Sequence, residues 1–190
     1  MHRVLFQKKE VLVLDLTGYS HVIHEFEPVF NQRSEILILG TLPSVKSREE
    51  RFYYGHKQNR FWKVLAGIVG ADVPVDAEQK KAFLLENHIA VWDVIAECDI
   101  IGSSDSSIRN VVPTDLKGLL EQTNIKRIYA NGATAYKLYM KYSFPLTNRE
   151  IVKLPSTSPA NAAYSLDKLI QIWKASLSLD EPIIMNKNAE

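Results

Sequence analysis

Several short apolar runs in this sequence are followed directly by residues that could bind a ligand. These following segments are 40–44, Asp93, 131–132 and 155–161, and they carry amides, hydroxyls, prolines and one carboxylate. If the runs are parallel strands, their carboxyl ends meet at one edge of a sheet, where ligands bind in such folds. A site of this composition, with aromatic rings beside it, would suit a flat polar ring. Turns also favour Asn, Gly, Pro and Ser, so each segment alone is equally consistent with an ordinary turn.

Several other chemistries lack the patterns that they require. No glycine-rich run ends in Gly-Lys-Ser/Thr and no spaced glycines follow the first apolar run, which excludes the common phosphate-loop and dinucleotide sites. Ser44, Ser156 and Ser158 lack the flanking glycines of a hydrolase nucleophile elbow. The five His residues form no metal-like pair at helical spacing, and Cys98 is the only cysteine. We therefore expect a site without a metal or another cofactor.

The chain alternates short β-branched and apolar runs with amphipathic stretches, which favours strands alternating with helices. The expected strands are 36–39, 89–95, 125–130 and 150–154. The expected helices are 59–69, one that begins at Asp76 with Gln79 completing a capping box, 115–122, 133–141 and one that begins near Ser165. Segments 41–58 and 102–107 are expected loops. This order predicts an α/β fold, a three-layer α/β/α domain with a central, mainly parallel four-stranded sheet.

Length and composition fit one ordinary domain, with 190 residues, 46% hydrophobic residues and a formal net charge of +1. We expect this domain at 22–179, an N-terminal extension at 1–21 and a C-terminal tail at 180–190. Val11, Val13 and Leu16 in the extension could form an edge strand or a loosely attached segment. No apolar run approaches the ~20 residues that span a bilayer, and no secretory signal is visible, so we expect a cytoplasmic protein.

Charge is distributed unevenly along the chain. Residues 46–63 carry six basic and two acidic side chains, residues 109–153 carry eight and three, and residues 64–108 carry two and eight. The two basic stretches flank three of the four apolar-run exits. This pattern is consistent with a basic face that binds a polyanion, and equally with ordinary solvated helix faces.

Two segments carry a specific resemblance to a known family. Residues 36–62 read ILILGTLPSVKSREERFYYGHKQNRFW, and residues 154–162 read LPSTSPANA. In this order and at this separation, they resemble the uracil-DNA glycosylase superfamily. The most similar branch is that of the hypoxanthine-DNA (deoxyinosine) glycosylases, and the likeness spans 22–178.

The sequence departs from other branches of that family. The mismatch-specific uracil/thymine branch shares the Asn-Arg-Phe-Trp element at 59–62 but has an Asn where this chain has Thr41-Leu42-Pro43. The water-activating Asp of the main uracil branch is also missing at that exit. Leu154 stands where related loops use a His to support the leaving anion. This last departure argues against efficient excision of uracil.

The resemblance implies a monofunctional, hydrolytic DNA glycosylase that rotates a deaminated base, above all hypoxanthine, out of the duplex. It makes Asn59 the residue that orients the attacking water. The residues that it places around the base are Gly40, Thr41, Pro43, Ser44, Tyr53, Tyr54, Phe61, Asp93 and Asn131. The residues that it places against DNA are His56, Lys57, Arg60, Pro155, Ser156, Thr157, Ser158, Pro159, Ala160 and Asn161. The implied partner is DNA that contains deaminated bases, so the protein should associate with the nucleoid when it acts. Nothing in the sequence suggests an obligate assembly, and we expect a monomer.

Alternative interpretations fit the same residues. A uracil or mismatch-specific glycosylase, a non-catalytic binder of damaged DNA and a hydrolase of free nucleosides could each use such a site. Asn59 could instead be the N-cap of the following helix. Phe61 could belong to the core rather than stack on a base. Asp93 could cap a turn, and His56 could pack within its loop.

Overall fold

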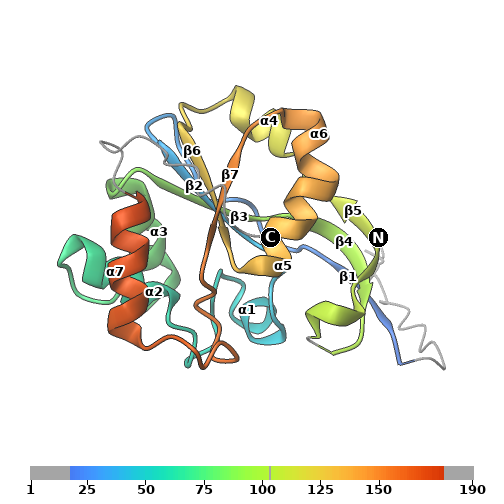
Figure 1. Ribbon diagram of the computed structural model, residues 1–190, viewed down its shortest axis with the longest axis horizontal. Coiled ribbons are helices and arrows are strands. Elements are labelled where there is room, and N and C mark those ends of the chain that lie inside the picture. The colour runs from blue at the N-terminus through green and yellow to red at the C-terminus, as the bar shows by residue number, and fades with distance from the viewer. Residues whose placement is uncertain (1–17, 103, 178–190) are drawn as a thin grey trace, which may run out of the picture.

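The centre of the protein is a four-stranded parallel sheet. The computed structural model describes residues 18–102 and 104–177. The sheet has the order β3-β2-β6-β7 and consists of β2 (Ile36–Gly40), β3 (Ile89–Asp93), β6 (Arg127–Asn131) and β7 (Ile151–Leu154). The predicted parallel sheet is therefore confirmed, with each strand close to its expected place. All four carboxyl ends lie along one edge, which is the lower edge in Figure 1.

Helices cover both faces of this sheet (Figure 1). One layer contains α2 (Phe61–Val69), α3 (Ala77–Glu86) and α7 (Leu166–Leu177). The other contains α4 (Leu116–Glu121), α5 (Ala133–Leu138), a π-helical turn η2 (Tyr139–Ser143) and α6 (Phe144–Thr147). Successive side chains of a strand point to opposite faces, so Ile36 and Ile38 pack in the first layer and Leu37 and Leu39 in the second. The predicted three-layer α/β/α architecture is confirmed.

A second, antiparallel sheet stands beside the first, and the sequence patterns do not predict it. Its order is β1-β4-β5, and its strands are β1 (Ser20–Ile23), β4 (Ile95–Ile100) and β5 (Arg109–Pro113). Val22, Ile95, Cys98 and Ile100 form a small core of their own. Since β1 begins at Ser20, this sheet includes residues on both sides of the expected domain boundary at 22. Val11, Val13 and Leu16 lie outside the described residues.

Several expected boundaries were wrong, each for a local reason. The expected strand 89–95 ends at Asp93, because the N–H groups of Val94 and Ile95 bond to the carbonyls of Gly40 and Thr41 and the chain then enters β4. The expected loop 41–58 contains a short helix, α1 (Val45–Glu50). Part of the expected loop 102–107 forms the 3-10 turn η1 (Asp105–Ser107).

Other local predictions are confirmed. The Asp76 side chain accepts from the Gln79 N–H at the start of α3, and the Gln79 side chain accepts from the N–H of Val75. Among the described residues, no helix has the length and apolar character needed to cross a membrane.

Candidate active site

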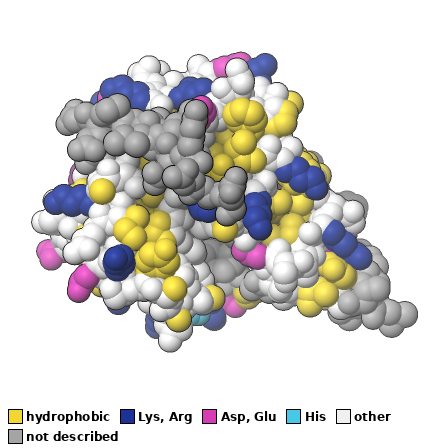
Figure 2. Space-filling model, in the orientation of Figure 1, with side chains coloured by type: hydrophobic (Ala, Val, Ile, Leu, Met, Phe, Trp, Pro, Cys, Tyr) yellow, Lys and Arg dark blue, Asp and Glu magenta, His cyan; other side chains and the backbone are white. Residues whose placement is uncertain are grey.

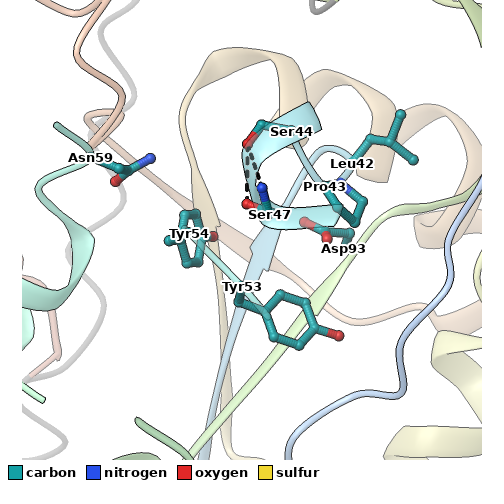
Figure 3. Close-up of a pocket in the computed structure, with 8 residues that line it drawn as sticks. All are labelled: Leu42, Pro43, Ser44, Ser47, Tyr53, Tyr54, Asn59 and Asp93. Carbon is teal, nitrogen blue, oxygen red and sulfur yellow. Dashed lines mark hydrogen bonds between the residues drawn. The ribbon is translucent and has the colours of Figure 1, made fainter. Parts of the chain in front are cut away.

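A cavity of about 100 Å³ lies at the carboxyl edge of the parallel sheet, between the ends of β2 and β3 and the segment that contains α1. Its lining residues are Leu42, Pro43, Ser44, Ser47, Tyr53, Tyr54, Asn59 and Asp93 (Figure 3). The lining combines aromatic rings, hydroxyls, one amide and one carboxylate, which is the composition that the sequence predicts. Within residues 18–102 and 104–177, no group of three or more His, Cys, Asp or Glu side chains could hold a metal ion.

Asp93 supplies the carboxylate of the pocket. It ends β3, its side chain is 5% exposed, and its Oδ2 lies 3.0 Å from Nε2 of His24. An ionised carboxylate only accepts hydrogen bonds, so His24 donates from Nε2. The other oxygen, Oδ1, lies against Gly40, where a Cβ would be 2.2 Å from it. Only a glycine at position 40 leaves room for this carboxylate.

Two serines hold the wall that α1 forms. Ser44 caps this helix, because its hydroxyl oxygen accepts from the N–H of Ser47 at 3.2 Å. The Ser47 hydroxyl oxygen accepts from the N–H of Gly55 at 3.1 Å, and the two serine hydroxyls are 3.1 Å apart. The serines therefore connect the start of α1 to the turn that carries Tyr53 and Tyr54.

Tyr53 and Tyr54 have different environments although they are adjacent. Tyr53 is buried, and its hydroxyl donates to the backbone carbonyl of Glu27 at 3.0 Å. Tyr54 has a left-handed backbone, with φ of 54°, and stacks on Phe61 with 3.8 Å between ring centroids. Its hydroxyl oxygen is buried and makes no hydrogen bond of normal geometry among the described residues, although the Asn131 side chain lies close to it. Burial raises the pKa of both phenols, the charge of Asp93 raises it further, and the Asn131 side chain partly lowers the pKa of Tyr54.

Asn59 lies on another side of the pocket, just before α2. Its Oδ1 accepts from the backbone N–H of Phe61 at 3.0 Å and from the hydroxyl of Thr157 at 2.9 Å. Figure 3 shows its amide nitrogen directed toward Tyr54 and Ser44, with the oxygen turned away. Asn59 therefore satisfies a backbone N–H at the start of α2 and also presents its NH2 group at the pocket.

Thr157 connects Asn59 to the parallel sheet. It is completely buried in the segment after β7. Its N–H donates to Oδ1 of Asn131 at 2.9 Å, and Nδ2 of Asn131 donates to the Thr157 hydroxyl at 2.9 Å. Both polar atoms of the Asn131 side chain are thus used inside the protein.

Arg60 supports the same segment from within. Its guanidinium donates to the backbone carbonyls of Ser158 at 2.7 Å, of Asn161 at 2.9 Å and of Tyr164. Its backbone N–H donates to the carbonyl of Thr157 at 3.0 Å. In Figure 1 this segment and α1 lie along the same lower edge of the sheet.

The structure divides the residues expected around the base into two groups. Those at the pocket are Pro43, Ser44, Tyr53, Tyr54 and Asp93, and Asn59, which was expected to orient the water, lies there as well. Those that lie behind the lining are Gly40, Thr41, Phe61 and Asn131. Three of the latter hold lining or adjoining groups in place, since Gly40 makes room for Asp93, Phe61 stacks on Tyr54 and Asn131 binds Thr157. The carbonyl of Thr41 accepts from Ile95.

The residues expected against DNA differ in their exposure. Lys57, Pro159 and Ala160 are exposed. Half-buried residues are His56, Arg60, Pro155, Ser156, Ser158 and Asn161. Thr157 is buried, and the guanidinium of Arg60 binds backbone carbonyls. The exposed members therefore mark the surface that could meet a nucleic acid, and the buried ones shape it.

Three residues of the site were not predicted from the sequence: His24, Leu42 and Ser47. Ser44 is a residue type that favours the N-cap position and could have indicated the start of α1, but no local pattern indicates Ser47. No local pattern could have indicated His24, because it lies 69 residues from Asp93 in the sequence.

Two lining residues bring a carboxylate oxygen and a phenol oxygen close together beside Gly40. The oxygens of Asp93 and Tyr54 lie next to the same residue, since a Cβ at Gly40 would be 2.2 Å from Oδ1 of Asp93 and 3.1 Å from Oη of Tyr54. A carboxylate oxygen accepts and a phenol at neutral pH donates. An acceptor beside a donor matches a ring edge in which an N–H adjoins a carbonyl.

Comparison with known proteins identifies relatives of this chain. A model of the uracil DNA glycosylase superfamily matches residues 27–176. The chain is 34% identical over 154 residues to a hypoxanthine DNA glycosylase of Methanosarcina acetivorans, covering 79% of this chain and 94% of that protein. A hypoxanthine DNA glycosylase of Methanosarcina barkeri is 34% identical over 109 residues, covering 56% and 69%. The solution NMR structure of a candidate uracil DNA glycosylase from M. acetivorans has a TM-score of 0.69 and 33% identity, covering 81% and 96%.

Proposed function

The chain belongs to the uracil DNA glycosylase superfamily, and from this membership we propose that it removes hypoxanthine from DNA by hydrolysing the N-glycosidic bond of deoxyinosine. Two Methanosarcina relatives carry the name hypoxanthine DNA glycosylase. The superfamily match covers both layers of helices and the whole parallel sheet. The proposal concerns the base that is removed and the residues that remove it.

The pairing of Asp93 with Tyr54 carries this proposal. Hypoxanthine has an N1–H beside its O6 carbonyl, so Oδ1 of Asp93 would accept from N1–H and the Tyr54 hydroxyl would donate to O6. Adenine reverses this pattern, with a ring nitrogen that accepts beside an amino group that donates. Two unmatched polar groups in a buried site each cost about 1–3 kcal/mol, which is enough to discriminate against adenine. Guanine, thymine and uracil also have an N–H beside a carbonyl, so selection against them has to come from the shape of the pocket and from the stability of the base pair.

Asn59 would hold the attacking water. Cleavage of an N-glycosidic bond passes through a cation-like sugar, so a neutral amide that positions water near the anomeric carbon suffices once the base is a good leaving group. The hydrogen bond from Tyr54 to O6 would stabilise the negative charge that develops on the departing base. His24 would keep the Asp93 carboxylate in place through the 3.0 Å contact between Nε2 and Oδ2.

The exposed residues near the pocket fit a DNA surface. Lys57 precedes Asn59 by two residues, and Pro159 and Ala160 form the exposed tip of the segment that Arg60 holds. A compact wedge of this kind could fill the space that an extruded nucleotide leaves in the duplex. Figure 2 shows Lys and Arg side chains dispersed over the face in view, with hydrophobic side chains between them.

The proposed function is tested with labelled duplexes that contain hypoxanthine, uracil, xanthine or a G·T mismatch, in which alkaline cleavage reveals abasic sites. We expect cleavage of the hypoxanthine duplex by the wild type. Asn59→Ala should lower the single-turnover rate at least about a hundredfold and leave a measurable residual rate. Asp93→Asn should lower it at least about tenfold, because the amide oxygen would bind His24 and turn an NH2 group toward N1–H. Asp72→Asn, an acid-to-amide change at an exposed loop position, serves as the matched control.

Other outcomes would assign another function. Retention of hypoxanthine DNA without any abasic product would indicate a non-catalytic damage binder. Cleavage of free inosine at a rate that salt does not affect would indicate a nucleoside hydrolase, because such an enzyme needs no phosphate contacts. Equal excision of uracil and hypoxanthine would contradict the proposed preference for hypoxanthine.

A further inference from the structure

The hydrogen bonds around Thr157 determine which atom of Asn59 can face the substrate. A side-chain amide can be placed in two orientations that differ only in the exchange of oxygen and nitrogen, so its orientation has to follow from its partners. Backbone N–H groups are suitable starting points, because they can only donate. Two such groups, those of Thr157 and Phe61, lie at the two ends of this network.

The backbone N–H of Thr157 determines the orientation of the Asn131 side-chain amide, at the end of the network that lies on β6. The N–H of Thr157 donates to Asn131 at 2.9 Å, so the acceptor atom of Asn131 is its oxygen and the remaining atom, Nδ2, donates. Nδ2 lies 2.9 Å from the Thr157 hydroxyl, which therefore accepts from Asn131. The hydroxyl proton is then available for Asn59, whose Oδ1 is 2.9 Å away.

The second backbone N–H leads to the same assignment from the helix side. The N–H of Phe61 donates to Asn59 at 3.0 Å, which requires the oxygen of the amide at that position. Oδ1 of Asn59 thus accepts two hydrogen bonds and is turned away from the pocket (Figure 3). The group that remains for a ligand is NH2, which can donate but cannot accept a proton.

We propose that Thr157 is a positioning residue that fixes Asn59 as a hydrogen-bond donor to the attacking water. The proposal rests on the proposed function and deepens it. Asn59 would bind a lone pair of the water and hold the oxygen over the anomeric carbon, without removing its proton. As the bond between the anomeric carbon and N9 breaks, the water oxygen bonds to that carbon, and its proton then passes through solvent to the departing hypoxanthine anion. The step therefore needs no general base at position 59. Thr157, completely buried, would act only through Asn59.

Variants of Thr157 test the positioning role. Thr157→Val removes the hydroxyl at nearly constant volume, and we expect a single-turnover rate on hypoxanthine DNA that is about tenfold to a hundredfold lower, with unchanged DNA affinity. Thr157→Ser keeps the hydroxyl and should restore most of the rate. Thr123→Val is the matched control, because its hydroxyl donates to the Leu119 carbonyl at 3.0 Å at the opposite edge of the sheet. A wild-type rate in Thr157→Val would overturn the proposal.

A double-mutant cycle separates positioning from a general structural effect. If Thr157 acts through Asn59, Thr157→Val should slow the Asn59→Ala variant no further. An equal slowing in both backgrounds would show that Thr157 does not act through Asn59. Asn59→Asp tests the donor role even if Thr157→Val does not fold, because a carboxylate can accept at the same place but cannot donate. It should be as slow as Asn59→Ala, and wild-type activity in Asn59→Asp would refute the donor assignment.

An NMR measurement keeps the proposal testable if the wild type excises no base. The two side-chain amide protons of Asn59 should exchange slowly with water in the wild type, because two donors hold Oδ1 and fix the orientation of the amide. In Thr157→Val their exchange with water should be at least about tenfold faster, while the backbone signals of α2 stay unchanged. Unchanged exchange would contradict the positioning role, whereas failure of the excision assay alone would contradict only the proposed function.

Discussion

Replacement of Tyr54 by Phe should stabilise the free protein while it impairs excision. The Tyr54 hydroxyl is buried and makes no hydrogen bond of normal geometry among the described residues, so the folded protein bears its desolvation cost. A buried polar group in this situation costs about 1–3 kcal/mol, and Tyr54→Phe should raise the free energy of unfolding by an amount near the lower end of this range. The stacking of the ring on Phe61, at 3.8 Å, does not depend on the hydroxyl.

The same substitution should slow removal of hypoxanthine. In the proposed complex the hydroxyl donates to a carbonyl oxygen that becomes negatively charged, and hydrogen bonds to charged groups contribute about 1.5–3 kcal/mol. Loss of this bond in the transition state corresponds to a rate lower by about tenfold to a hundredfold. Stability and activity should therefore change in opposite directions.

Tyr53→Phe provides the control at the adjacent position. Its hydroxyl is satisfied by the Glu27 carbonyl at 3.0 Å, so this substitution should lower stability by about 1 kcal/mol. Urea unfolding followed by tryptophan fluorescence gives both stability changes, and single-turnover cleavage of a deoxyinosine duplex gives the rates. A Tyr54→Phe protein that is less stable than the wild type, or equally active, would refute the reasoning.

Four further predictions follow from the site and its supports. Gly40→Ala should lower the free energy of unfolding by about 1–3 kcal/mol and impair excision, because the new Cβ would be 2.2 Å from Oδ1 of Asp93. Thermal unfolding should show that the double variant Gly40→Ala/Asp93→Ala is more stable than Gly40→Ala alone. Arg60→Lys should destabilise the protein by about 1–3 kcal/mol and weaken DNA binding, since one ammonium cannot serve the carbonyls that the guanidinium reaches; equal melting curves would contradict this. The free energy of unfolding should fall above about pH 10, because raised pKa values keep Tyr53 and Tyr54 protonated in the folded protein whereas the unfolded chain loses these protons. Urea titrations should show a decrease of up to about 1.4 kcal/mol per pH unit for each phenol. The decrease should be smaller in the variant with Phe at both positions. Lys57→Ala should reduce the slope of log affinity against log salt by about 1 if this exposed lysine contacts a phosphate, and an unchanged slope would exclude that contact.

Much of the central fold could be predicted from local patterns. The runs at 36–39, 125–130 and 150–154 are short, apolar and separated by amphipathic stretches, and strands buried on both faces have this appearance. The Asp76 cap was likewise visible because the partners of a capping interaction lie three residues apart. The second sheet was missed, since only one residue separates β3 from β4 and the apolar run 89–95 therefore extends from one sheet into the first residue of the other.

The sequence indicates which side chains lie at the carboxyl edge of the sheet, but only in part what those side chains contact. Asn59, Ser44 and Asp93 stand at strand exits or helix starts, so their place at the edge of the sheet follows from the order of the elements. Phe61 and Tyr54 could each have stacked on a base, and the structure shows that they stack on each other. Arg60 has the sequence context of a phosphate ligand, yet its guanidinium binds carbonyls in the segment 158–164.

Periodicity, capping and turn preferences are properties of neighbouring residues, so the elements, their order and the chemical types of side chain at the edge of the sheet could be inferred from the chain. Which of those side chains are free to meet a ligand depends on contacts between distant segments. His24 lies 69 residues from Asp93 in the chain, and Thr157 lies 98 residues from Asn59. A hydrogen bond depends on distance and direction in space, and folding alone brings such distant residues within reach of each other.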